Sequence, residues 1–297
     1  MHGGEQWRAF SRKVEDLGYS TLLMADHLGE QLSPVPALAA AAAATTRLRV
    51  GTLVTCNDFR HPVVHAKEVA TLDVLSDGRA EWGMGAGWVQ SEYAAAGIPF
   101  DEPGTRVERL QESVAVMKQL FGDGPATYRG THYEVSSLDG QPKPVQRPHP
   151  PLTVGGQGER MLAFASREAD VISVAPSITA RRVGTSAPSE TVESAADRQV
   201  ALIRDVAGER FADLELNMVL FPLAVTDSPE DCAAAWSEHL GYEPEEVLRS
   251  PHVGAGTVDE ICDVLLERRE RWAISYWSVP STEIDAFAPV VARLAGR

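Results

Sequence analysis

Residues 47–87, RLRVGTLVTCNDFRHPVVHAKEVATLDVLSDGRAEWGMGAG, contain the pattern that decides the fold. The apolar run 47–55 is typical of a buried strand, and 80–87 of a second strand that is rich in glycine. Between them, periodic apolar residues predict a helix over 62–75, which ends in the turn 76–78. A strand, a helix and another strand in this order predict two parallel strands joined by a crossover helix.

The same alternation continues on both sides of this stretch. The clearest helix covers 105–121, and a short hairpin is expected at 128–135. Seven strands in an alternating chain of this length predict an α/β fold, a TIM (β/α)8 barrel, as one domain over 1–297. The strands are expected at 21–25, 47–55, 80–87, 152–154, 171–175, 214–225 and 275–279.

The amino-acid composition limits the kinds of molecule that this protein could bind. The chain has 297 residues and a formal net charge of −15, which opposes binding to nucleic acid or to an anionic membrane. Its three cysteines form no CxxC pair, and no segment resembles a signal peptide or a membrane span. We therefore expect a cytoplasmic protein with a small-molecule substrate. Residues 184–197 are small and polar, and predict a mobile loop or insertion.

In a barrel of this kind, chemistry takes place at the carboxyl ends of the strands. Asp26 and His27 follow the first strand, so His27 could transfer a proton while Asp26 orients it or binds cofactor. A capped turn is the plainer alternative. The second strand becomes polar around Thr55 and Cys56, which indicates that it reaches the barrel mouth.

Two glycine-rich strand ends could approach a ligand. Gly85 and Gly87 follow the third strand, where a tight turn is as good an explanation as a binding loop. Gly155, Gly156, Gln157 and Gly158 lead from a strand directly into a helix. Free N–H groups at such a helix start favour phosphate binding. The histidines show no metal-ligand spacing, so no metal site is expected.

These residues together resemble the luciferase-like monooxygenase superfamily, and within it the branch that uses the deazaflavin coenzyme F420. The matching stretches are LGYSTLLMADHL (17–28), RLRVGTLVTCNDFRHP (47–62), the segment 71–99 with LSDGR, GxGxG and SEY, and PPLTVGGQGERMLAFASREADVI (150–172). The resemblance implies a strand ahead of the first helix. Because residues 1–5 are too short for one, the first strand is expected to be missing from this chain, with the true start upstream.

The resemblance also implies roles for particular residues. Leu53-Val54 would match a bulged, often cis peptide that supports one face of the ring, and 155–158 would match the loop that binds the coenzyme's phosphate. Asp26 with Thr55 or Cys56 would approach the polar edge of the ring, and His27 would match the histidine that handles the proton. Gly85, Gly87 and Ala175, at the ends of their strands, complete the expected cofactor contacts, and Arg60 or Arg160 could hold the coenzyme's polyglutamate tail.

The activity implied is an F420-dependent oxidoreductase that transfers hydride to or from a small organic substrate. An FMN-dependent monooxygenase is the first alternative, and a flavin-binding protein without turnover is the second. F420-dependent sugar-phosphate dehydrogenases carry a catalytic Glu after the GxGxG turn, where this chain has Trp88. Oxidation of sugar phosphates is therefore not expected. Relatives of this type are commonly homodimers, and the same is expected here.

Overall fold

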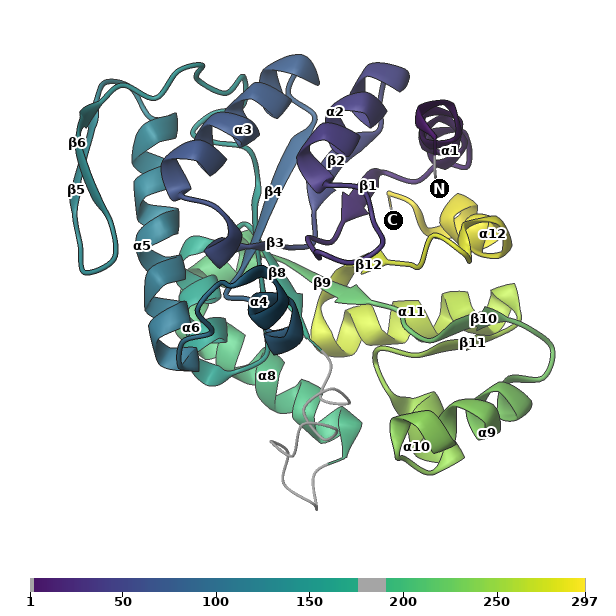
Figure 1. Cartoon of the computed structure of the whole chain (residues 1–297). Helices are drawn as coiled ribbons and strands as arrows, with labels where there is room; N and C mark the ends of the chain where they lie inside the picture. Colours follow the sequence, from purple (N-terminus) through teal and green to yellow (C-terminus); the bar gives the residue numbers. More distant parts are fainter. Residues whose placement is uncertain (1–2, 176–190, 297) are drawn as a thin grey trace. The chain divides into compact units, whose positions relative to one another are not determined.

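The computed structural model describes residues 3–175 and 191–296 (Figure 1). They form two compact units: residues up to 15 with 20–155, and 16–19 with the residues from 156 onward. In both units, parallel strands are connected through helices. The α/β class that the alternating sequence predicts is confirmed, and the first element described is a helix.

The first unit contains four parallel strands in the order β1, β2, β4 and β7. A fifth, very short strand, β3, pairs with β4 beyond the end of β2. All six residues of β4 are buried, which explains its continuous apolar and glycine composition. The bounds are β1 Thr21–Met24, β2 Arg49–Thr52, β3 Thr55–Cys56, β4 Ala80–Gly85 and β7 Leu152–Gly156.

Helices pack on this sheet through small and apolar side chains. α2 contacts β2 and α3 contacts β4, with Leu38 and Leu48 almost completely buried. Trp82 of β4 lies edge-on to Phe121 of the long helix α5, and its indole N–H donates to the Pro150 carbonyl at 2.7 Å. The helices are α1 Gly4–Asp16, α2 Pro34–Ala44, the 3-10 turn η1 Asn57–Phe59, α3 Pro62–Leu75, α4 Gln90–Ala96 and α5 Pro103–Phe121.

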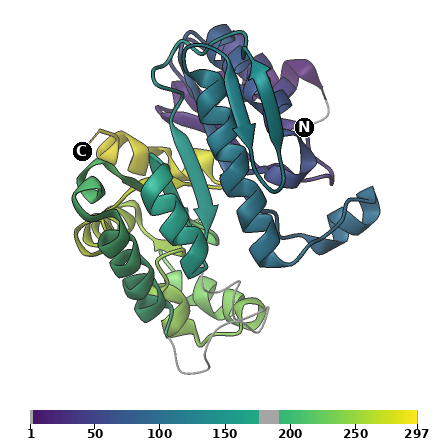
Figure 2. The same ribbon diagram turned by 90° about the vertical axis from the view of Figure 1, so that its left-hand side faces the viewer.

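A hairpin lies outside the sheet and packs beside α5 (Figure 2). Its antiparallel strands are β5 Ala126–Arg129 and β6 Glu134–Leu138, which confirms the hairpin predicted around 128–135. Glu112 of α5 accepts three backbone hydrogen bonds from its turn, from Thr131, His132 and Tyr133. One carboxylate therefore fastens the hairpin to the helix.

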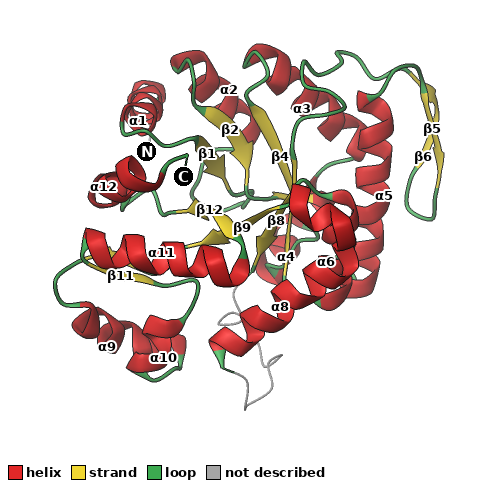
Figure 3. Cartoon of the chain, turned by 180° about the vertical axis from the view of Figure 1, so that it is seen from behind, coloured by secondary structure: helices red, strands yellow, loops and turns green. Residues whose placement is uncertain are grey.

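The second unit contains three parallel strands, in the order β8, β9 and β12, and a separate pair, β10 and β11. α6 packs against α8, and α11 packs against α12 (Figure 3). Apolar residues of β10, α11 and α12 form one hydrophobic core of this unit. The elements are α6 Glu159–Glu168, β8 Val171–Val174, α8 Val192–Ala207, η2 Gly208–Asp213, β9 Glu215–Val219, β10 Leu223–Val225, α9 Pro229–Leu240, α10 Pro244–Arg249, β11 Gly254–Gly256, α11 Val258–Trp272, β12 Ile274–Ser278 and α12 Ile284–Leu294.

Two sequence predictions need correction here. The strand expected over 214–225 is two strands in different sheets, interrupted around Pro222, which has no N–H to donate to a strand ladder. The mobile loop expected over 184–197 is wrong for 192–197, which begin α8 behind the N-cap Thr191. The rest of that segment, 184–190, lies outside the described residues.

Candidate active site

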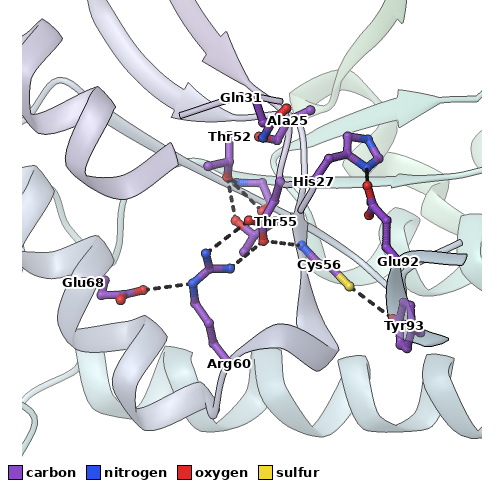
Figure 4. A network of polar contacts seen from close by, with 12 residues as sticks. Ala25, His27, Gln31, Thr52, Thr55, Cys56, Arg60, Glu68, Glu92 and Tyr93 are labelled. Atoms are coloured by element: carbon purple, nitrogen blue, oxygen red, sulfur yellow. Dashed lines mark hydrogen bonds and ion pairs between the residues drawn. The ribbon is translucent and has the colours of Figure 1, made fainter. Parts of the chain in front are cut away.

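The carboxyl ends of β1, β2 and β4 bring the predicted site residues of the first unit together (Figure 4). Met24 of β1 is in register with Thr52 of β2, and Cys56 of β3 is in register with Gly85 of β4. Parallel neighbours end at the same edge of a sheet, so the residues that follow each strand become close neighbours. His27 and the segment that follows β2 therefore belong to one site.

The buried carboxylate of Asp26 organises this site. It accepts two hydrogen bonds from the Arg60 guanidinium, at 2.5 and 3.1 Å, and a third from the Cys56 backbone N–H at 3.0 Å. The Asp26 side chain is only 4% exposed. A bidentate pair of this kind is geometrically specific and holds the turn after β1 against the start of η1.

Arg60 also reaches Glu68 of α3, at 3.4 Å. Burial alone would lower the pKa of Arg60, but its hydrogen bonds and ion pairs with these carboxylates raise it above the usual value. Burial, with the nearby Asp26 charge, raises the pKa of Glu68 despite its contact with Arg60. Arg60 is thus already committed to two carboxylates, which argues against the predicted role in holding a polyglutamate tail.

The β2 strand is interrupted before β3, at the residues predicted to support a ring. The Leu53–Val54 peptide is cis, as the resemblance implies. Both side chains are partly exposed, whereas Thr52 and Thr55 on either side are buried and hydrogen-bonded to each other at 2.9 Å. A half-exposed apolar surface between buried polar residues suits the face of a planar ring.

The glycines of β4 make room for this interruption. A Cβ atom on Gly85 would lie 2.6 Å from Val54 Cγ2, and one on Gly83 would overlap the Thr52 carbonyl oxygen. Gly87 has φ +79°, and a Cβ atom there would overlap the Tyr93 hydroxyl. These glycines therefore accommodate neighbouring parts of the chain, a role that the sequence pattern did not separate from ligand contact.

Cys56 belongs to a second buried network. Its Sγ lies 3.1 Å from the Tyr93 hydroxyl, which donates to Asp58 at 3.1 Å, and Asp58 pairs with Arg109 of α5 at 2.9 Å. Burial raises the pKa of the Cys56 thiol, and burial with the Cys56 and Asp58 contacts raises the pKa of Tyr93. Both shifts favour the protonated forms, and the Cys56 side chain points at the Tyr93 hydroxyl.

His27 is the accessible member of the site. Its side chain is 35% exposed, its Nδ1 lies 3.1 Å from both carboxylate oxygens of Glu92, and its ring meets the edge of Trp88 at a centroid distance of 6.1 Å. Trp88 is 69% exposed. Glu92 also lines a cavity of about 400 Å³, with Leu28, Gly29, Ser91, Ala95 and Ala96.

The predicted phosphate loop runs from Gly155, the last residue of the first unit, into the second unit. Gly158 is the N-cap of α6 and gives no side-chain cap, and a Cβ atom built on it would meet none of the described residues within 4 Å. The Ala175 N–H donates to the Gly156 carbonyl at 3.0 Å, so the two predicted segments are neighbours. An uncapped, open helix start fits a phosphate group.

Sequence reasoning missed Glu92, Asp58 and Arg109 as parts of the site. Glu92 is 65 residues from His27 and on an element that follows β4, whereas His27 follows β1. The available signal was an acidic residue in the first turn of a helix directly after a glycine-rich strand end. Asp58 and Arg109 gave no local signal, because charged residues on a turn and on a helix are ordinary surface features.

The described part of the chain offers neither a metal site nor a membrane-spanning helix. No group of three His, Cys, Asp or Glu residues there could hold a metal ion. No helix within residues 3–175 and 191–296 combines the length and apolar character needed to cross a membrane.

Comparison with curated proteins finds relatives of two cofactor types. An uncharacterized protein of Mycobacterium tuberculosis is 35% identical over 227 residues, which cover 72% of this chain and 77% of the relative. An F420-dependent glucose-6-phosphate dehydrogenase of Microbacterium testaceum is 31% identical over 169 residues, covering 54% and 49%. An FMNH2-dependent dimethylsulfone monooxygenase of Pseudomonas putida is 31% identical over 128 residues, covering 43% and 35%.

Solved structures show the same fold. An F420-dependent secondary alcohol dehydrogenase matches with a TM-score of 0.78 at 18% identity, covering 99% of this chain and 96% of that one. A monooxygenase from Streptomyces bottropensis matches with a TM-score of 0.74 at 22% identity, covering 99% and 94%. These likenesses establish the luciferase-like TIM-barrel fold. The family model for luciferase-like monooxygenases matches residues 4–272, and the chain therefore belongs to the luciferase-like monooxygenase family.

Proposed function

We propose that this protein is an F420-dependent oxidoreductase that moves hydride between the deazaflavin coenzyme and a small organic substrate. The observation that supports this most is the position of His27, which is 35% exposed and follows β1, the neighbour of the strand β2 that ends at Thr52, directly before Leu53 and Val54. An imidazole next to a partly exposed apolar strand end suits a proton transfer that takes place beside a planar ring.

The resemblance to this family suggests which residues would hold the coenzyme. When bound, the coenzyme supplies a carbon atom that accepts or donates hydride. Leu53 and Val54 would support one face of its ring, and 155–158 with the uncapped start of α6 would bind its phosphate. His27 takes the hydroxyl proton when an alcohol is oxidised, and returns it to the carbonyl oxygen in the reverse direction. Asp26, paired with Arg60, holds the turn that carries His27.

The substrate proposed is not a sugar phosphate. Trp88 stands where the sugar-phosphate dehydrogenases of this superfamily carry a catalytic Glu, and its indole is largely exposed beside His27. The cavity that Glu92 lines also has Leu28, Ala95 and Ala96 in its wall, and none of its lining residues that the structure describes is a basic residue that could pair with a phosphate. A small organic molecule without a phosphate fits this lining better.

An FMN-dependent monooxygenase is the second candidate, favoured by the 31% identity to the FMNH2-dependent enzyme of Pseudomonas putida. The two candidates differ in the cofactor bound and in the need for oxygen. Parallel fluorescence titrations with F420 and FMN test them. We expect micromolar binding of F420 and much weaker binding of FMN, and the opposite preference would overturn the F420 assignment. Analytical ultracentrifugation of the same sample tests the predicted homodimer, and the number of calorimetric unfolding transitions tests the proposed single-domain organisation over 1–297.

A binding protein without turnover is distinguished by His27→Ala. For an enzyme, this variant should keep its F420 affinity and lose turnover by about 10²-fold or more, because a positioned acid or base contributes that much. The side chain is part of a surface turn, so the variant is expected to fold. A protein without turnover has none to lose, and failure to find any hydride transfer with bound F420 would favour that alternative.

A further inference from the structure

The contact between His27 and Glu92 also decides which ring nitrogen of His27 carries a proton. Both oxygens of Glu92 lie 3.1 Å from the same ring atom, Nδ1, and the Glu92 side chain is only 19% exposed (Figure 4). The ring also lies nearly perpendicular to the indole of Trp88, at an interplanar angle of 85°. The imidazole is therefore held on one side by a carboxylate and on another by an indole.

A carboxylate can accept hydrogen bonds but has no proton to donate. Nδ1 of His27 must therefore carry the proton of this hydrogen bond, which leaves the lone pair of the neutral ring on Nε2. Nε2 makes no hydrogen bond to any residue that the structure describes. The free nitrogen is thus the basic one, and it is the one that a substrate could reach.

Glu92 is itself held in place by its neighbour in α4. Tyr93 is 1% exposed and its hydroxyl is anchored between Cys56 and Asp58. The next turn of the chain ends at Gly97 in the left-handed conformation, which closes the short helix. The strand-end network that contains Cys56 therefore also fixes the carboxylate that faces His27.

From this geometry we propose that Glu92 is a positioning residue, which keeps the proton on Nδ1 of His27 and presents Nε2 to the substrate. The proposal rests on the hydride-transfer function proposed above. When an alcohol is oxidised, its C–H bond loses hydride to the coenzyme and its O–H proton goes to Nε2, so the products are a carbonyl compound, reduced coenzyme and imidazolium. Glu92 stabilises that imidazolium without taking its proton, and in the reverse direction Nε2–H returns the proton.

The first test needs neither coenzyme nor substrate. Ring 15N chemical shifts of His27, assigned among the eight histidines by their loss in His27→Ala, report its tautomer at a mildly alkaline pH. The wild type is expected to show Nδ1–H. Glu92→Gln should show a mixture, because an amide can either donate to Nδ1 or accept from it. Glu30→Gln removes the same charge from a nearby exposed site and should leave the wild-type spectrum unchanged.

The second test is kinetic. Glu92→Gln should lower kcat on the order of 10²-fold while the F420 dissociation constant stays within about twofold, since Glu92 acts on the base rather than on coenzyme binding. In the His27→Ala background the same change should cause no further loss, because Glu92 acts through His27. Additive losses would mean that Glu92 acts elsewhere.

The outcomes separate this proposal from the one it rests on. A wild-type Nδ1–H signal that persists unchanged in Glu92→Gln overturns the positioning role, whatever the coenzyme. Failure of F420 to bind overturns the proposed function, while the tautomer measurement still decides what Glu92 does to His27. Both the positioning role of Glu92 and the proposed function are supported if Glu92→Gln shows a mixed tautomer, a lower kcat and an unchanged coenzyme affinity.

Discussion

Replacing Asp26 by Asn should reveal how much the buried pair with Arg60 contributes to stability. The exchange keeps the shape of the side chain and one oxygen for the Cys56 N–H, but it removes the charge that faces the guanidinium. The two side chains are 4% and 16% exposed, so water can do little to replace the lost partner. Breaking a buried ion pair by removing one charge costs about 3 to 5 kcal/mol.

We take the lower end of that range, about 3 kcal/mol, because Glu68 remains as a second partner of Arg60. Urea unfolding, monitored by circular dichroism, measures this loss of unfolding free energy. With an m-value of about 3 kcal/mol/M, the midpoint should fall by about 1 M. Asp123→Asn is the matched control, since it breaks an exposed pair with Arg147 and should leave the midpoint unchanged.

A double-mutant cycle shows whether the loss of stability comes from the interaction between Asp26 and Arg60. Arg60→Met alone should also be destabilising, because it leaves Asp26 buried without its partner, and the double variant should lose less than the sum of the two. A midpoint for Asp26→Asn equal to that of the wild type, with an unchanged m-value, would refute the reasoning. Additive losses would show that each side chain stabilises the fold through other contacts.

Three further predictions address other parts of the molecule. Gly158→Glu places a negative charge at the start of α6 and should weaken coenzyme binding by about tenfold or more in titrations, whereas Gly158→Ala, which meets open space, should bind normally. Gly87→Ala should lower the thermal unfolding midpoint clearly more than Gly124→Ala. Both glycines have a positive φ, but only a Cβ atom on residue 87 would overlap a neighbour, the Tyr93 hydroxyl. Equal shifts of the midpoint in the two variants would contradict this prediction. Burial opposes ionisation of Glu112, but three backbone N–H bonds lower its pKa below 4.5, so its stabilising effect is present above that pH and is lost as the pH falls through the folded-state pKa. The difference in unfolding free energy between the wild type and Glu112→Gln should therefore shrink below about pH 4.5. A difference that stays constant with pH would contradict this prediction.

Much of the fold could be predicted because its signals are local. Apolar periodicity located the strand at Thr21–Met24 and the helix Pro103–Phe121, where the structure has both. The predictions failed where a local pattern was ambiguous. The run 214–225 is apolar enough for one strand, but its division between two sheets depends on partners far away in the chain.

The candidate site shows the same division. Asp26, His27, Leu53-Val54 and 155–158 could be picked out because polar or glycine residues directly follow strands, and barrel sites form at strand ends. Their partners could not be picked out, since Arg60 is 34 residues from Asp26 and Glu92 is 65 residues from His27. No spacing rule connects positions that meet only when β1, β2 and β4 lie side by side.

The sequence by itself determined the alternation of strands and helices, the strand ends that bear polar groups and the family to which the chain belongs, because each depends on residues close together in the chain. Only the tertiary structure decided which atoms of those groups are accessible. It buried Cys56 and Asp26 in hydrogen-bonded networks, and it directed a carboxylate at Nδ1 of His27 while Nε2 bonds to none of the residues described. Burial and hydrogen-bond geometry depend on every element that packs around a site, and they exist only once the chain has folded.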